Sequence, residues 1–398
     1  MNSDQYPSLP LRRIGSLVGG GTPTSNDENW NGSVPFVTPP DLRPVTGGLV
    51  VNTDRFLTEE GAASGSSVVP ADSVLLSIRA PIGYVARTGM RAAFNQGCRA
   101  ILPRASVNSR YLTYALVAAG PELESLGRGT TFMELSATQM AALEVPVPSL
   151  DEQRAIADYL DRETARIDTL IEEQQRLIEM LRERRAAAIV DAFATMRGDG
   201  KGLGEGYDPI PWLPDLRIER VQMRHLCTIG TGSSDSVDAV DEGYPFFVRG
   251  NQPLALDHYE FDTEAIITAG DGAMVGRSFH HYRGKFAAHQ RVYVLRDFRA
   301  VFPRYLFWYF STYFIRVVGD GGAQATVPSV RMPMIAGMPV PIPPLDEQRR
   351  VVEYLDEQTA KIDALIAETE RFIELAHERR AALITAAVTG QIDVQEMA

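Results

Sequence analysis

Residues Val145–Arg154 read VPVPSLDEQR, and residues Val340–Arg349 read VPIPPLDEQR, 195 positions later in the same chain. The likeness extends beyond this motif, because an ungapped comparison of Val145–Ile189 with Val340–Ile384 gives 27 identities in 45 positions. Solenoid and propeller repeats are far shorter, at about 20–50 residues. The sequence therefore predicts one duplicated module and not a repeat array.

A long helix is expected after each copy of the motif. Prolines occupy the first half of both copies, and proline and glycine are then absent for about 45 residues. Asp151-Glu152 and Asp346-Glu347 place negative charge at the start of each expected helix, where the helix dipole favours it. The other residues are mainly strong helix formers such as Glu, Arg, Gln and Ala.

Apolar residues recur at heptad spacing along both helices, which indicates that each helix has a partner. The two stripes belong to one chain, so we expect them to pair with each other as a coiled coil. The spacing allows parallel or antiparallel pairing, and separate packing of each helix on its own domain is the alternative. The residues expected to pair are Leu160, Ile167, Leu170, Gln174, Leu177, Leu181, Leu355, Ile362, Leu365, Thr369 and Phe372.

The composition is that of a globular protein of two to four domains, with 398 residues, 44% of them hydrophobic. The two cysteines, Cys98 and Cys227, suggest neither a metal site nor a disulfide framework, so we expect a cytoplasmic location. Of the net charge of −12, the segments 151–200 and 346–398 hold −10. The regions before them are close to neutral, which leaves room for local basic surfaces there.

Those two regions resemble each other weakly but in the same order. Each combines short β-branched strands with Gly and Pro turns and an aromatic helix, such as SRYLTYAL at Ser109–Leu116 and PRYLFWYF at Pro303–Phe310. The segment Phe94–Pro103 (FNQGCRAILP) corresponds to Ala288–Arg296 (AHQRVYVLR). We therefore expect two similar α+β domains. The glycine-rich segment Gly198–Gly206 lacks a phosphate-loop pattern and is interpreted as a linker.

This order of parts resembles the specificity (S) subunit of type I restriction-modification systems. The motifs that carry the resemblance are Leu150–Arg154, Leu345–Arg349 and the ending AVTGQIDV at Ala387–Val394. The resemblance implies two target recognition domains and two conserved helices that pair as an antiparallel coiled coil with pseudo-twofold symmetry. The implied boundaries are domain 1 at 1–148, spacer 1 at 149–197, linker and domain 2 at 198–343, and spacer 2 at 344–398.

The resemblance also implies partners and a role. The chain would bind double-stranded DNA at a split, asymmetric sequence, and it would dock two modification (methyltransferase) subunits together with restriction subunits. It would carry no cofactor, because S-adenosylmethionine, ATP and Mg²⁺ belong to those partners. A helix of about 40 residues is about 60 Å long, which is ample for readers in successive major grooves about 34 Å apart.

Candidate DNA contacts follow from the residue types that read bases and bind phosphates. They cluster in four segments, residues 79–99, 127–131, 249–252 and 277–291. The histidines of the last segment have no cysteine or carboxylate at ligand spacing, which disfavours a metal site. The candidates are Arg79, Arg87, Arg91, Asn95, Gln96, Arg99, Arg128, Thr130, Arg249, Asn251, Gln252, Arg277, His280, His281, Arg283, Lys285, Gln290 and Arg291.

Catalytic motifs do not emerge from the sequence. Thr38–Asp41 (TPPD) lacks both the first residue and the aromatic of an adenine methyltransferase motif, and no cofactor loop precedes it. We therefore expect no catalysis by this chain. The alternative to DNA recognition is a coiled-coil scaffold whose variable domains bind proteins. The sequence specifies neither the target bases nor the oligomeric state of the isolated chain.

Overall fold

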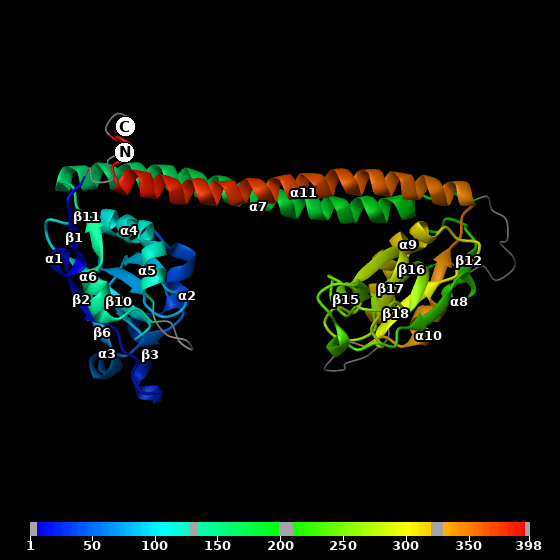
Figure 1. Ribbon diagram of the computed structural model, residues 1–398, viewed down its shortest axis with the longest axis horizontal. Helices are drawn as coiled ribbons and strands as arrows, with labels where there is room; N and C mark the ends of the chain where they lie inside the picture. The colour runs from blue at the N-terminus through cyan, green and yellow to red at the C-terminus, as the bar shows by residue number, and fades with distance from the viewer. Residues whose placement is uncertain (1–5, 128–133, 199–209, 320–328, 395–398) are drawn as a thin grey trace. The chain divides into compact units, whose positions relative to one another are not determined.

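The computed structural model describes residues 6–127, 134–198, 210–319 and 329–394. They belong to two compact units, unit 1 (residues 1–175 and 370–398) and unit 2 (residues 176–369). Each unit holds a mixed helix-and-sheet head and one part of each of two long helices, α7 (Leu150–Ala194) and α11 (Leu345–Val388) (Figure 1). The predicted α+β class with two long helices is confirmed.

Head 1, within residues 6–146, contains a five-stranded sheet (β2-β10-β7-β8-β4), a four-stranded sheet (β5-β3-β9-β6) and the pair β1-β11. Its core lies between the larger sheet and α4, and it also takes in apolar residues of α7 and α11. The strands are β1 (Ser8–Pro10), β2 (Gly15–Gly19), β3 (Trp30–Val37), β4 (Leu49–Val50), β5 (Phe56–Leu57), β6 (Ser67–Val69), β7 (Val74–Ser77), β8 (Val85–Thr88), β9 (Ala92–Phe94), β10 (Cys98–Pro103) and β11 (Glu144–Pro146). The helices are α1 (Leu11–Ile14), α2 (Pro39–Leu42), α3 (Glu59–Gly65), α4 (Ser109–Ala118), α5 (Gly120–Leu126) and α6 (Ala137–Ala142).

Head 2, within residues 210–341, contains a six-stranded sheet (β13-β18-β16-β17-β14-β15) and the pair β12-β19. The aromatic helix α9 packs between this sheet and the long helices, and its Tyr305, Tyr309 and Tyr313 surround Phe193 of α7. The strands are β12 (Arg220–Gln222), β13 (Thr228–Thr231), β14 (Tyr244–Phe247), β15 (Leu254–Leu256), β16 (Phe261–Ala269), β17 (Phe279–Ala288), β18 (Val292–Arg296) and β19 (Pro339–Pro341). The helices are α8 (Met223–Leu226), α9 (Pro303–Gly319) and α10 (Met332–Gly337).

The long helices pair in antiparallel orientation in unit 1. Ile167 and Ile171 of α7 form an apolar cluster with Ala376 of α11. Nε of Arg380 lies 2.9 Å from Oδ1 of Asp168, which adds an ion pair beside this cluster. The early part of α7 is thus matched with the late part of α11.

The helices are also antiparallel in unit 2, where α7 supplies the arginine of the ion pair and α11 supplies the aspartate. Nε of Arg185 on α7 lies 2.8 Å from Oδ1 of Asp363 on α11. Further on, the backbone N–H of Arg197 donates to Oε1 of Glu347 at 2.8 Å. Because Asp363 and Arg185 are the repeat equivalents of Asp168 and Arg380, each unit contains the same ion pair with its partners on opposite helices.

The stripe by which the helices pair is narrower than predicted, and Leu170, Leu177, Leu365 and Phe372 lie outside it. These four residues are between 36% and 49% exposed, whereas Ile171 and Ile178 are 5% and 6% exposed. A two-helix seam accepts positions that alternate three and four residues apart. The residue next to a seam position points about 100° away around the helix. In the pairs Leu170-Ile171 and Leu177-Ile178, only the isoleucine is therefore buried.

The other residues of the predicted stripe are buried or half-buried. Leu160, Ile167, Leu181, Leu355 and Ile362 are less than 10% exposed. Gln174 is half-buried in unit 1 and Thr369 is buried in unit 2, where its hydroxyl donates to the Leu365 carbonyl at 2.7 Å. The pairing of these two polar residues with each other stays a prediction.

Candidate nucleic-acid interface

Each head is attached to the long helices by the glutamine of its LDEQR motif. In unit 1 the Gln153 side chain is buried, donates to the Pro148 carbonyl at 2.9 Å and accepts from the N–H of Asn108 at 2.8 Å. In unit 2 the buried Gln348 donates to the Pro343 carbonyl at 2.9 Å and accepts from the N–H of Phe302 at 2.8 Å. The accepted N–H belongs in each case to the residue just before α4 or α9. The motif therefore joins the aromatic helix of a head to the start of a long helix.

The change Gln153→Ala should lower the free energy of unfolding by about 2–3 kcal/mol, because it leaves a buried carbonyl and an N–H without partners. Chemical denaturation of the purified chain measures this loss. Gln175→Ala is the matched control, since Gln175 is an exposed glutamine of the same helix. Equal denaturation midpoints for the two variants would contradict the proposed role of the motif.

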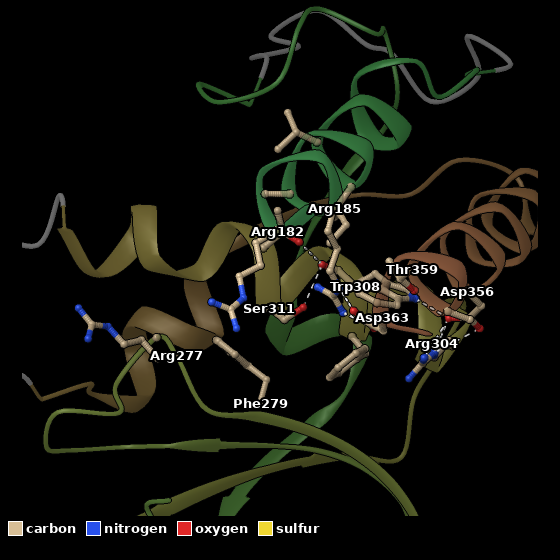
Figure 2. A pocket seen from close by; sticks show the side chains of 17 residues that line it. Arg182, Arg185, Arg277, Phe279, Arg304, Trp308, Ser311, Asp356, Thr359 and Asp363 are labelled. Atoms are coloured by element: carbon tan, nitrogen blue, oxygen red, sulfur yellow. Dashed lines mark hydrogen bonds and ion pairs between the residues drawn. The ribbon is translucent and has the colours of Figure 1, made fainter. Parts of the chain in front are cut away.

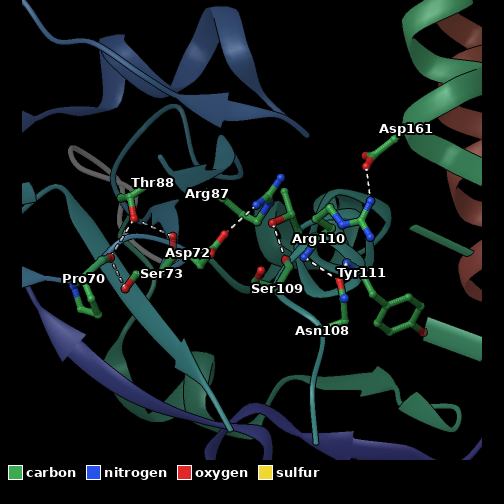
Figure 3. Close-up of polar contacts among 11 residues, drawn as sticks. Pro70, Asp72, Ser73, Arg87, Thr88, Asn108, Ser109, Arg110, Tyr111 and Asp161 are labelled. Carbon is green, nitrogen blue, oxygen red and sulfur yellow. Dashed lines mark hydrogen bonds and ion pairs between the residues drawn. The ribbon is translucent and has the colours of Figure 1, made fainter. Parts of the chain in front are cut away.

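A second contact between head and helices uses an arginine and an aromatic residue on the same aspartate. In unit 1, Nη1 of Arg110 lies 2.7 Å from Asp161 and 2.8 Å from Asp158, and the Tyr114 hydroxyl donates to Asp161 at 2.8 Å. Burial is the main cause that raises the pKa of the Tyr114 hydroxyl, which therefore stays a donor. Figure 3 shows Arg110 directed at Asp161.

The equivalent contact in unit 2 replaces the tyrosine with a tryptophan. Nη2 of Arg304 lies 2.9 Å from Asp356, and the indole N–H of Trp308 donates to the same carboxylate at 2.9 Å. The guanidinium groups of Arg304 and Arg185 lie 5.0 and 5.7 Å from the Trp308 ring, which adds cation–π attraction. These residues line a groove of about 920 Å³, shown in Figure 2. The shared chemistry of both contacts holds each head in one orientation on its own pair of helix segments.

Three candidate arginines of head 1 are held by carboxylates. Nε of Arg79 lies 3.2 Å from Glu134. Nη1 of Arg87 lies 2.8 Å from Asp72 and its side chain is 17% exposed (Figure 3). Arg91 makes two hydrogen bonds to Glu59, at 3.0 and 2.9 Å, and these lower the pKa of the Glu59 carboxyl.

Three further head 1 candidates, Asn95, Gln96 and Arg99, lie on or beside the turn between β9 and β10. Asn95 Oδ1 accepts from the N–H of Gly97 at 3.0 Å, and the exposed Gln96 is hydrogen-bonded to the Thr22 hydroxyl. Arg99 is half-buried within β10. Arg128 and Thr130 lie outside the described residues.

In head 2 two candidate arginines converge on one carboxylate. Nη1 of Arg249 lies 3.2 Å from Oδ1 of Asp271, and Nη1 of Arg291 lies 2.7 Å from Oδ2 of the same residue. Gln290 is exposed and donates to Asp235 at 2.8 Å. Asn251 and Gln252 are exposed next to Arg249 in the chain. The structure therefore brings together side chains from the segments 249–252 and 277–291.

Two histidines of head 2 face the protein and not solvent. His281 Nε2 lies 2.9 Å from Glu264, and its ring stacks on Phe307 of α9 with centroids 5.6 Å apart. The His280 ring lies 4.9 Å from the Phe247 ring, and burial lowers the pKa of both histidines. These contacts favour a packing role for both histidines, and their contact with DNA stays a prediction.

The other head 2 candidates, Arg277, Arg283 and Lys285, are exposed. Arg277 lines the groove beside α7 and α9 (Figure 2). Lys285 Nζ lies 4.5 Å from the Tyr259 ring centre, within cation–π range. Among the helices of the described residues, none combines the length and apolar composition that a membrane crossing requires.

A sequence model of the family "Type I restriction modification DNA specificity domain" matches residues 9–180 and 218–374, most of the chain and both of its repeats. The chain belongs to this family. Each of the two matched segments covers one head and most of one long helix.

Individual members of the family were also found among known proteins. The MjaIX specificity subunit of Methanocaldococcus jannaschii is 35% identical over 175 residues, which cover 43% of this chain and 40% of the relative. The EcoDI specificity subunit of Escherichia coli is 28% identical over 191 residues, covering 48% and 40%. The matched part thus spans about 40% of the length of these curated relatives.

Solved structures share the fold. A chain from a study of complex assembly and conformational transition in a type I R-M system superposes with a TM-score of 0.74 at 16% identity, covering 97% of this chain and 98% of that one. The specificity subunit of Thermoanaerobacter tengcongensis gives a TM-score of 0.52 at 17% identity, covering 98% of each chain.

Proposed function

We propose that this chain is the DNA sequence-specificity subunit of a type I restriction-modification complex and recognises an asymmetric, bipartite double-stranded DNA sequence. The observation that carries the proposal is that both heads repeat the same attachment to the long helices while their loops differ. Attachments of the same kind suit one shared assembly, whereas different loops suit the reading of different bases. Modification and restriction subunits supply catalysis, with their S-adenosylmethionine, ATP and Mg²⁺, and the chain acts beside them in the cytoplasm.

Co-expression with a type I methyltransferase subunit from the same genome tests this function. Mapping of methylated adenines in the host DNA should reveal one asymmetric sequence of two different halves with a fixed gap. Methylation by the chain alone with S-adenosylmethionine would show that it is itself an enzyme. A stable complex without sequence-dependent methylation would instead favour a protein-binding scaffold.

We further propose that the apolar residues exposed on the long helices bind the methyltransferase subunits. In unit 1 they are Leu170, Phe372 and Leu375, and in unit 2 the repeat equivalents are Leu365, Leu177 and Met180. All six are between 36% and 58% exposed. The segments that carry them are acidic, which disfavours contact with DNA phosphates. A patch present twice suits two copies of one partner.

The double variant Phe372→Asp/Leu375→Asp should lose one of two bound methyltransferase subunits, because two charges would then be buried in an apolar contact. Native mass measurement of the purified complex gives the stoichiometry. Ala381→Asp adds a charge at another exposed position of α11 and should leave the stoichiometry unchanged. If the double variant still binds two subunits, the patch is not the docking surface.

A further inference from the structure

The two heads share a backbone frame at the turn that follows β9 in head 1 and β17 in head 2. A parallel strand pair leads into it in each head, β3 with β9 and β14 with β17. The residue after the pair then donates its N–H back across it, from Asn95 to the Val37 carbonyl at 3.0 Å and from His289 to the Phe247 carbonyl at 2.9 Å.

After this hydrogen bond, the two heads make the same series of side-chain and backbone contacts. Asn95 Oδ1 accepts from the N–H of Gly97, and His289 Nδ1 accepts from the N–H of Arg291, both at 3.0 Å. In head 1 the N–H of Ile78 then donates to the Gly97 carbonyl at 2.9 Å, and the N–H of Leu135 donates to the Ile78 carbonyl at 2.8 Å. In head 2 the N–H of Gly270 donates to the Arg291 carbonyl at 2.9 Å, and the N–H of Val330 donates to the Gly270 carbonyl at 2.7 Å. By this chain of contacts, Arg79 of head 1 is the structural equivalent of Asp271 in head 2. In the same way Gly97 is equivalent to Arg291, and Pro39 is equivalent to Arg249.

The side chains on this frame differ between the heads. In head 2, Arg249 and Arg291 are 45% and 61% exposed, and the Asp271 that holds both is 20% exposed. Although burial raises the pKa of Asp271, the hydrogen bonds from Arg291 and Arg249 outweigh it and the pKa lies below its usual range. Each guanidinium has five N–H donors and uses one Nη1 on this aspartate, so most of each donor fork faces solvent.

Head 1 places a single arginine on the same frame. Arg79 is 49% exposed in its side chain and is held by Glu134. Proline and glycine occupy the positions of the two head 2 arginines, and a Cβ built on Gly97 would lie 3.1 Å from Pro39. The frame is thus repeated while its guanidinium groups change in number and position.

Exposed ion pairs contribute little to stability, so folding alone does not explain two arginines fixed on one aspartate. Holding a guanidinium in place before binding removes part of the entropy cost of a contact. An arginine fork matches O6 and N7 of guanine in the major groove. Asp271 has each of its two oxygens engaged by one arginine and serves to orient both.

We propose that this frame is the base-reading site of both heads, where Arg249 and Arg291 each read a guanine of one half-site and Arg79 reads a guanine of the other. The proposal rests on DNA recognition by this chain. If it is correct, the half-site that head 2 recognises contains at least two G·C pairs.

The test uses the chain in complex with its methyltransferase. Arg249→Ala and Arg291→Ala should each weaken binding of the cognate duplex by about 5- to 150-fold and relax methylation at one position of one half-site. Arg79→Ala should relax the other half-site only. Replacing the contacted guanine with 7-deazaguanine, which lacks N7, should weaken the unmodified complex but not the matching arginine variant.

Arg296→Ala is the control, because this exposed arginine of head 2 pairs with the adjacent Asp297 and lies outside the frame. Head 2 variants that match this control in affinity and methylation pattern would overturn the proposal, as would a head 2 half-site with fewer than two G·C pairs. Retained binding of two methyltransferase subunits shows that each variant is folded. An unmodified complex that methylates no specific sequence would instead refute the proposed function itself.

Discussion

Exchanging residues 1–145 for the corresponding head of another family member should change one half of the methylated sequence and leave the other half unchanged. Head 1 carries its own sheets and its own candidate contacts, and it shares its main core with the helix segments of unit 1. Specific recognition of DNA exceeds non-specific binding by about 10³-fold or more, so the original sequence should lose essentially all methylation. Mapping of methylated adenines with and without the exchange measures the effect.

The replacement head needs an arginine and a tyrosine or tryptophan where this chain has Arg110 and Tyr114, because these residues attach the head to Asp161. The reciprocal exchange of residues 198–343 is the matched control and should alter only the other half of the sequence. A change in both halves after either exchange would show that the heads do not read independently.

Phe193→Ala should lower the free energy of unfolding of unit 2 by about 3–5 kcal/mol, more than any other substitution proposed for this unit. Phe193 is fully buried, and its ring lies 5.5–5.7 Å from the rings of Tyr305, Tyr309 and Tyr313. The cavity left by the substitution would separate α7 from the aromatic helix of head 2. Tryptophan fluorescence during urea denaturation reports mainly on this unit, since Trp212 and Trp308 lie in it and Trp30 does not.

Val190→Ala provides the comparison, because Val190 lies on the same helix and is 43% exposed. Its effect should stay within about 0.5 kcal/mol, as is usual for surface substitutions. Similar midpoints for the two variants would mean that Phe193 does not anchor α7 to head 2.

The repeated proline-rich motif was recognisable from its letters, but the function of its glutamine was not. Nothing local in LDEQR says that Gln153 contacts Asn108, 45 positions earlier in the chain. The one available signal was that a polar residue recurs at the same place in both copies, among residues expected to be exposed. A buried amide that meets two backbone groups is the physical reason for its recurrence.

The sequence by itself determined the duplication, the α+β heads and the two long helices, because periodicity and proline placement act locally along the chain. Only the tertiary structure decided that Ile171 and Ile178 are buried while Leu170 and Leu177 are not, since this depends on the width of the seam with the partner helix. It also decided which loop residues meet: Arg249, Asp271 and Arg291 lie 20 or more positions apart, and strand pairing alone brings them to one carboxylate. Contacts between distant segments depend on chain topology, which local pattern does not encode.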